Sequence, residues 1–130
     1  MDIQQLIASL SACTNPDASV RKAGEEAVKQ VGAAPEGMPT LLRIAMEASI
    51  DPAVRQVAAI TFKNTAKRDW ADRESRPSAI SATDKATVRT LLLEALVQAP
   101  GTVRVQVEEA LKAVISSDFP EQWPNLTSMI

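Results

Sequence analysis

The chain has 130 residues, of which 45% are hydrophobic and 23% are charged, a composition typical of one globular domain with a buried core. Its formal net charge of −2 disfavours a nucleic-acid partner, because proteins that neutralise phosphates carry an excess of lysine and arginine. Histidine is absent and cysteine occurs once, which argues against an enzyme active site, a metal site or a disulfide framework; we also expect no cofactor.

Membrane segments and base-stacking surfaces are also not predicted. No apolar run approaches the roughly 18 residues that a membrane-spanning helix needs, and the N-terminus shows no charged-then-apolar leader. Aromatic residues make up only 3% of the chain, too few for a platform that stacks single-stranded bases. We expect a soluble intracellular protein without a membrane partner.

The first two helices are predicted from apolar spacing. Apolar residues recur three and four positions apart within 2–13, and Cys13 is interpreted as a small buried hydrophobe on the same helix. A turn at 15–17 separates this helix from a second one, which Gly32 ends. The expected inward residues are Ile3, Leu6, Ile7 and Leu10, then Val20, Ala23, Gly24, Ala27, Val28 and Val31.

Two further helices repeat this arrangement over 35–70. The third helix is expected within 35–49, and Asp51 followed by Pro52 is typical of a helix start, with a cap and a proline in the first turn. Trp70 is interpreted as a buried plug at the end of the fourth helix. The expected inward residues of the third helix are Met38, Leu41, Leu42, Ala45 and Ser49.

A polar stretch over 71–82, with a proline and interspersed charges, predicts a loop. Thr83 or Asp84 is then expected to cap a fifth helix, which breaks at Pro100 and Gly101 before a sixth. No segment alternates apolar and polar residues, so strands are not predicted. The expected core residues of these two helices are Val88, Leu91, Leu92, Ala95, Leu96, Val103, Val107, Ala110, Leu111 and Val114.

One layout begins the second, fourth and sixth helices. Proline, then valine and arginine, occur at the start of each, and lysine follows nine residues after the valine. The interval from the second to the third copy exceeds the first interval by about the length of the loop after Trp70. The aligned residues are Val20, Val54 and Val103, Arg21, Arg55 and Arg104, and Lys29, Lys63 and Lys112.

A recurring unit of two helices predicts an all-α fold, an α-solenoid of antiparallel helix pairs that stack on their neighbours. The proline-valine-arginine start resembles the HEAT repeat, in which it marks the second or B helix of a pair. The expected boundaries are 1–34 for the first repeat, 35–70 for the second, 71–82 for the loop, 83–118 for the third, and 119–130 for the start of a fourth.

The aligned lysines should point away from the core stripe of their B helices, at one repeated angle. Each lysine alone is more often solvated surface, whose aliphatic stem covers apolar neighbours. A stacked row on the face that solenoids use for binding favours a functional interpretation.

Three ordered motifs give the sequence a resemblance to the importin-β (karyopherin-β) superfamily of nuclear transport receptors. Arg21 and Glu25 match the family's N-terminal arginine and glutamate, although Gly24 stands where alanine is usual. Residues 60–64, I-T-F-K-N, and residues 118–126, D-F-P-E-Q-W-P-N-L, are similar to two further family signatures. The resemblance covers the whole chain and is strongest to the branch of importins seven and eight. It implies an N-terminal fragment of a longer receptor.

The resemblance implies that Ran-GTP binds the concave B-helix face and controls cargo binding and release in nuclear import. Cargo proteins and nucleoporins would bind repeats that lie outside this chain, and the receptor would shuttle between cytoplasm and nucleus. Asn64 either contacts Ran or hydrogen-bonds the backbone. The residues assigned to Ran are Lys29, Lys63, Asn64, Lys67 and Lys112.

Alternative functions belong to other classes. The sequence also resembles the exportin that recycles importin-α, and a HEAT scaffold that does not bind Ran is a further possibility. A HEAT-like DNA glycosylase would use a tryptophan with a carboxylate, here Trp70 with Asp69, but the acidic composition disfavours it.

The C-terminal end of the stack is expected to expose apolar residues that the next repeat of a longer receptor would cover, so the fragment is predicted to self-associate there. Phe119, Trp123 and Leu126 should pack the junction to that repeat. The residues expected on the exposed end are Val107, Leu111, Val114, Phe119, Trp123, Leu126 and Ile130.

Overall fold

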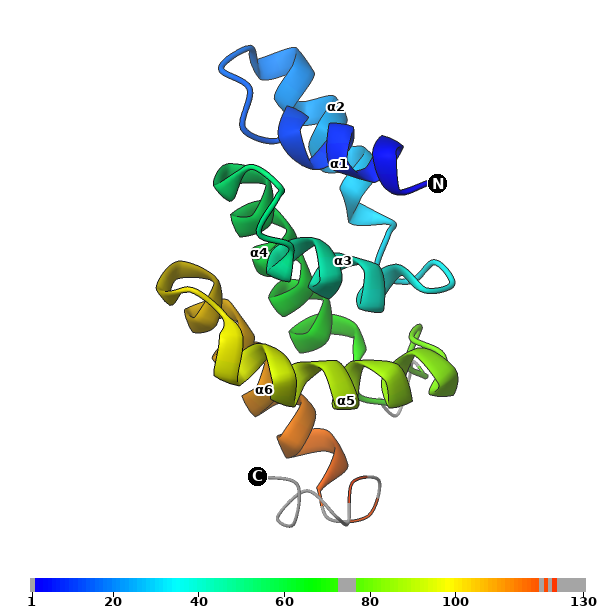
Figure 1. Cartoon of the computed structure of the whole chain (residues 1–130). Coiled ribbons are helices and arrows are strands. Elements are labelled where there is room, and N and C mark those ends of the chain that lie inside the picture. The colour runs from blue at the N-terminus through cyan, green and yellow to red at the C-terminus, as the bar shows by residue number, and fades with distance from the viewer. Residues whose placement is uncertain (1, 73–76, 120, 122, 124–130) are drawn as a thin grey trace.

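The computed structural model describes residues 2–72, 77–119, 121 and 123. Within these residues the regular elements are six α-helices, and none is a strand (Figure 1). Their bounds are α1 Ile3–Ala12, α2 Ala18–Lys29, α3 Gly37–Met46, α4 Pro52–Asp69, α5 Ala82–Gln98 and α6 Gly101–Asp118. The all-helical prediction is confirmed.

The helices stack in pairs along the molecule (Figure 1). Within the pairs α1 packs against α2, α3 against α4, and α5 against α6. Between the second and third pairs α3 contacts α5 and α4 contacts α6, whereas between the first and second pairs the main contact is α1 with α4. The A helices α1, α3 and α5 thus form one layer and the B helices α2, α4 and α6 the other, as expected of an α-solenoid.

Short polar side chains cap the N-termini of α1, α2, α4 and α5. The Asp17 carboxylate accepts hydrogen bonds from the first turn of α2, and Asp51 accepts one from the Ala53 N–H at 2.8 Å, with Pro52 as the first residue of α4. The prediction that Thr83 or Asp84 caps the fifth helix is wrong. Ser81 begins α5, and its hydroxyl accepts a hydrogen bond from the Asp84 N–H at 3.1 Å.

The repeated arginines share one structural role. Arg21 donates to the Asn15 carbonyl at 3.2 Å, Arg55 to the Ala45 carbonyl at 2.9 Å, and Arg104 to the Val97 carbonyl at 3.1 Å. Each acceptor lies in the last turn of the preceding A helix or just after it. Because terminal carbonyls lack intrahelical partners, a B-helix arginine that reaches back stabilises the end of its own A helix.

The core lies between the two layers and extends through all three pairs as one cluster. Several residues expected to face inward do not. Ile3, Val20 and Ala23 are exposed, because they lie on the outer side of the first pair, where no other helix of the described chain packs. Ser49 is exposed because α3 ends at Met46. The largest fully buried side chains are Trp70, Phe62, Leu10, Met38, Leu41, Leu42, Ile44, Leu92, Val88, Val107 and Val114.

Two buried carboxylates link the second pair to the third. The Asp84 carboxylate of α5 accepts a hydrogen bond at 2.9 Å from the Glu36 N–H, at the start of α3, where Glu36 has a left-handed φ of 63° and offers no side-chain cap of its own. The Asp118 carboxylate of α6 accepts from Trp70 Nε1 at 3.0 Å and from Arg89 Nε at 2.9 Å. Both carboxylates are satisfied, as buried charges must be.

The C-terminal end of the described chain differs from the expectation. Val107, Val114 and Trp123 are buried, whereas Phe119 is 39% exposed. Besides Phe119, the exposed large apolar residues of the last described pair are Val97, in the last turn of α5, and Val105, near the start of α6, and Leu111 is half-buried. Val107 and Val114 are buried because α6 packs this stripe against α4 and α5. Leu126, Ile130, most of the expected fourth repeat and loop residues 73–76 lie outside the described residues. Self-association stays a prediction for sedimentation.

None of the helices in the described residues is long and apolar enough to cross a membrane.

Candidate functional site

The three aligned lysines all lie on B helices but differ in their electrostatic surroundings. Lys29 is 66% exposed and its ammonium lies 3.8 Å from the Glu26 carboxylate; Lys112 is 74% exposed and lies 3.1 Å from Glu109. Lys63 is half-buried and has no ion pair or hydrogen bond with another described residue. Lys63 is therefore the aligned lysine whose charge is not offset by a neighbouring carboxylate.

Glu109 joins lysines of two successive B helices. Its carboxylate lies 3.1 Å from Lys112 of the same helix and 3.4 Å from Lys67 of α4. Hydrogen bonds from Lys112 and, to a smaller extent, from Lys67 hold the pKa of Glu109 below its ordinary value. The structure thus brings Lys67 and Lys112 together at the junction of α4 and α6.

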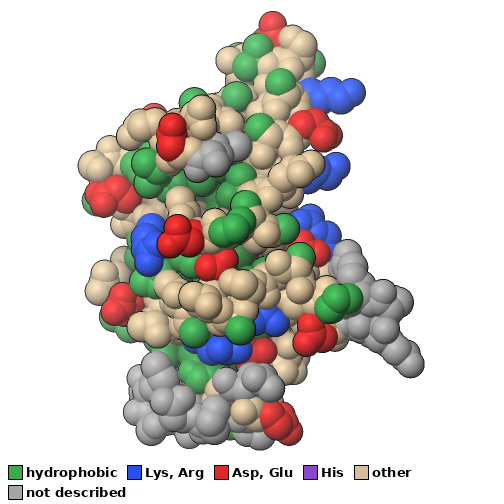
Figure 2. Space-filling model, turned by 90° about the vertical axis from the view of Figure 1, so that its right-hand side faces the viewer, with side chains coloured by type: hydrophobic (Ala, Val, Ile, Leu, Met, Phe, Trp, Pro, Cys, Tyr) green, Lys and Arg blue, Asp and Glu red, His purple; other side chains and the backbone are tan. Residues whose placement is uncertain are grey.

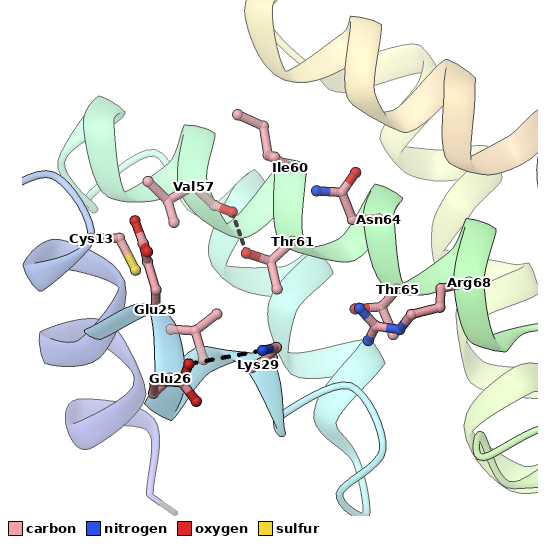
Figure 3. A pocket seen from close by; sticks show the side chains of 11 residues that line it. Cys13, Glu25, Glu26, Lys29, Val57, Ile60, Thr61, Asn64, Thr65 and Arg68 are labelled. Atoms are coloured by element: carbon pink, nitrogen blue, oxygen red, sulfur yellow. Dashed lines mark hydrogen bonds and ion pairs between the residues drawn. The ribbon is translucent and has the colours of Figure 1, made fainter. Parts of the chain in front are cut away.

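Asn64 and Lys29 lie elsewhere, on the walls of a groove between α2 and α4 (Figure 3). This α2–α4 groove has a volume of about 480 Å³ and is lined by Cys13, Glu25, Glu26, Val28, Lys29, Val57, Ile60, Thr61, Asn64, Thr65 and Arg68. The Asn64 side chain is exposed and makes no hydrogen bond with the described residues, so the expected alternative, a bond to the backbone, is not found there.

The groove is closed at one end by a close approach of the chain. A Cβ added to Gly32, just after α2, would lie 2.3 Å from Thr65 Cγ2 of α4, so only glycine fits there without a shift. At the other end Cys13, Glu25 and Val57 lie at its mouth (Figure 3). Cys13 is half-buried, and burial, with a smaller contribution from the charge of Glu25, raises the pKa of its thiol.

Charges of both signs cover this part of the surface. Basic side chains recur down one edge of the molecule in Figure 2, with acidic side chains close to them. The continuous row of lysines expected on the B helices is therefore divided into a groove with glutamates on its α2 wall and a lysine cluster around Glu109.

Sequence reasoning missed the glutamates, although a signal was present. Glu26 and Glu109 each precede an aligned lysine by three residues, a spacing that places both side chains on one helical face. The second B helix has Ile60 at the equivalent position. Lys63 therefore lacks the glutamate that pairs with Lys29 and with Lys112.

The glycosylase alternative is wrong. Trp70 is 1% exposed, with its ring between helices, and Asp69 is paired with Arg68 at 2.8 Å, so the two side chains offer no exposed base-binding pair. Among the described residues no group of three histidine, cysteine, aspartate or glutamate side chains could hold a metal ion.

Comparisons with known proteins identify the family. A family model described as the importin-beta N-terminal domain matches residues 24–98. Similar proteins include the importin beta-like SAD2 homolog of Arabidopsis thaliana, 34% identical over 100% of this chain, human Importin-8, 33% identical over 100%, and Exportin-2 of Oreochromis niloticus, 32% identical over 99%. The chain spans 13% of the length of each of these relatives.

A solved structure agrees with this assignment. The exportin Cse1 in its cargo-free, cytoplasmic state matches with a TM-score of 0.88 and 26% sequence identity, over 99% of this chain and 14% of that one. The helical stack, the matched family model and the relatives all point to one conclusion: the chain belongs to the importin-beta N-terminal domain family.

Proposed function

We propose that the chain is the N-terminal region of a nuclear transport receptor and that its B-helix face binds Ran-GTP. The observation that carries this proposal is the family match, which runs from the middle of α2 to the end of α5 and includes Lys29, Lys63, Asn64 and Lys67. Lys112 lies beyond the matched range but shares Glu109 with Lys67.

Electrostatics supports a role for the lysines in association. A GTPase surface that presents carboxylates is steered toward exposed ammonium groups, which raises the association rate more than the final affinity. Lys63 contributes a positive charge with no paired carboxylate among the described residues, whereas Glu109 offsets part of the charge of Lys67 and Lys112. Each solvated pair with the partner would contribute about 1 kcal/mol or less. The effect of the face therefore depends on several lysines together.

Two directions of transport fit the relatives, which bear the names of importins and exportins. In an importin, Ran-GTP and cargo weaken each other's binding, so that cargo is released where Ran-GTP is abundant. In an exportin of the importin-α-recycling type, which the likeness to Exportin-2 and Cse1 favours, they strengthen each other's binding. The sign of this reciprocal coupling in the longer receptor distinguishes the two.

The proposed receptor shuttles between cytoplasm and nucleus. Cargo proteins and nucleoporins bind it through repeats outside this chain, because the chain spans only 13% of the relatives' length. The chain itself is proposed to act by protein binding and not as an enzyme.

The experiment that tests the proposal compares Ran-GTP with Ran-GDP. We expect the purified chain to bind Ran-GTP weakly and Ran-GDP less, because a single patch of a larger site loses the effective concentration that linked patches provide, often ~10²-fold or more. Titration calorimetry or surface plasmon resonance measures both affinities. Equal affinity for the two nucleotide states would reject the proposal and leave a HEAT scaffold that does not respond to nucleotide.

A further inference from the structure

We propose that a polar pocket beside Trp70 binds a phosphate group, either on a phosphorylated side chain of a partner protein or as the free anion. The pocket has a volume of about 530 Å³ and lies between the loop after α4, the first turns of α5 and the end of α6, at the right-hand end of α5 in Figure 1. None of its described lining residues is assigned to Ran-GTP. The inference therefore goes beyond the proposed function and does not depend on it.

Lys85 supplies the charge that attracts an anion. This residue of α5 lines the pocket and is half-buried, and its ammonium lies 5.4 Å from the centre of the Trp70 ring. It has no hydrogen bond or ion pair with another described residue. Because the ammonium is partly removed from water and contacts only a ring face, an anion in the pocket would stabilise it further.

Arg89 supplies hydrogen-bond donors in a fixed direction. Its Nε and Nη2 atoms lie 2.9 and 2.8 Å from one oxygen of Asp118, which also accepts from the Trp70 indole N–H at 3.0 Å. A guanidinium has five N–H donors, so those on Nη1 remain for a ligand. Since Asp118 holds the guanidinium in place, these donors are oriented before a ligand arrives, as strong charge-assisted bonds to a phosphate require.

A hydroxyl group adds a third donor to the pocket. Ser117, near the end of α6, is exposed, lines the pocket and has no hydrogen bond with another described residue. Lys85, Arg89 and Ser117 can thus each donate to one ligand. A phosphate monoester matches them better than a carboxylate does, because it offers three strong acceptor oxygens and a charge of about −1.5 to −2 at pH 7.

Two carboxylates also line the pocket and act against an anion. The charge of Asp118 is offset by Arg89. Asp72 is exposed, and its carboxylate accepts from the Ser78 N–H at 2.6 Å without a basic partner among the described residues. Its negative charge should weaken phosphate binding. Asp72→Asn, which removes the charge and keeps an oxygen acceptor for Ser78, is therefore expected to strengthen binding.

Nuclear magnetic resonance with two phosphate probes tests the proposal. The Trp70 indole N–H and the Arg89 Nε–H serve as reporters, because both donate to Asp118 beside the pocket. The probes are inorganic phosphate and N-acetyl-O-phosphoserine amide, titrated at about pH 7.5, above the second pKa of phosphoserine, about 6. We expect saturable shifts of both reporters. Tighter binding of the phosphoserine probe identifies a phosphorylated protein as the source, and equal or tighter binding of inorganic phosphate identifies the free anion.

Charge variants separate a binding site from a general effect of salt. Lys85→Gln should weaken both probes several-fold, whereas Lys85→Arg should keep binding and Asp72→Asn should strengthen it. Lys22→Gln, at an exposed position of α2 that does not line the pocket, is the matched control and should bind like the wild type. Melting curves verify folding of each variant. Absent shifts, shifts that sodium chloride reproduces at equal ionic strength, or an affinity that either Lys85→Gln or Asp72→Asn leaves unchanged would overturn the proposal.

Discussion

The two junctions of the stack differ in how tightly they are closed. Between the second and third pairs both layers are in contact, and Asp84, Asp118 and Glu109 form polar links across or beside the junction. Between the first and second pairs α1 packs on α4, and the turn after α2 approaches α4 closely where Gly32 meets Thr65. The α2–α4 groove lies beside this contact. A stack of similar repeats can thus combine a closely packed junction with one that leaves a groove on its surface.

The strongest test of the closed junction removes its central carboxylate. Asp118→Ala would leave the buried Trp70 N–H and Arg89 without their acceptor, and we expect a loss of about 3–5 kcal/mol in the free energy of unfolding. Urea unfolding measures the loss. Glu108→Ala, on an exposed position of the same helix, should change it by about 0.5 kcal/mol or less. Comparable losses for the two variants would contradict the role of Asp118.

The open junction depends on a close approach that an added methyl group would disturb. Gly32→Ala places a Cβ against Thr65 Cγ2, and we expect a loss of about 1–3 kcal/mol through overpacking. Because α2 must move away from α4, Cys13 should also be alkylated faster. Thr65→Ser removes the methyl group that is met first, so the double variant should regain part of the loss. Additive losses in the double variant would show that the contact is not the cause.

The cap that α5 provides to α3 has a smaller expected effect. Asp84→Ala leaves the Glu36 N–H unsatisfied, and the loss should be about 1–2 kcal/mol. Asp84→Asn keeps an oxygen acceptor, and its loss should be smaller. Thermal melting of the two variants tests this order, and an equally stable Asp84→Ala variant would contradict the proposed cap.

The smallest expected effect on stability concerns Glu109, whose ion pairs are solvated. Because the pKa of Glu109 is lowered in the folded chain, the stabilisation from its pairing is fully present above the ordinary pKa of a glutamate and is lost as pH falls through the lower folded pKa. Lys112→Gln should raise this pKa more than Lys67→Gln, since Lys112 makes the larger contribution. Carboxyl chemical shifts followed by NMR against pH measure both changes. The reverse order would contradict the account.

Most of the fold could be predicted from the sequence because it depends on local signals. The spacing of apolar residues and the Asp51-Pro52 start predicted the helices. The repeated arginines marked the starts of the B helices, and their side chains hydrogen-bond carbonyls at the ends of the preceding A helices. The cap of α5 was misassigned because Ser81 and Asp84 both lie at a polar helix start, and only the tertiary contact with Glu36 determines what Asp84 does.

The candidate site was harder to predict because it depends on how the repeats sit on each other. The equivalent positions of Lys29, Lys63 and Lys112 could be found by aligning the three copies of the repeated layout. The groove could not be found in this way, because it depends on the packing of α1, and not of α2, on α4. The contact of Lys67 with Glu109 joins residues of different repeats. The exposure of Ile3 and Val20 likewise depends on what packs against the first pair, which the apolar pattern does not specify.

The central claim, that B-helix lysines attract Ran-GTP, is tested most directly by the association rate of Lys63→Glu. Lys63 is the aligned lysine without a paired carboxylate in the described chain, so reversing its charge should change the field of this face without breaking an internal ion pair. The control is Arg43→Glu, a charge reversal at an exposed position of the A helix α3.

Stopped-flow measurement at low and high salt compares the wild-type chain with both variants. We predict that Lys63→Glu slows association with Ran-GTP several-fold at low salt, that the difference shrinks as salt screens the charges, and that Arg43→Glu associates like the wild type. An association rate for Lys63→Glu equal to that of the wild-type chain at both salt concentrations would contradict the claim.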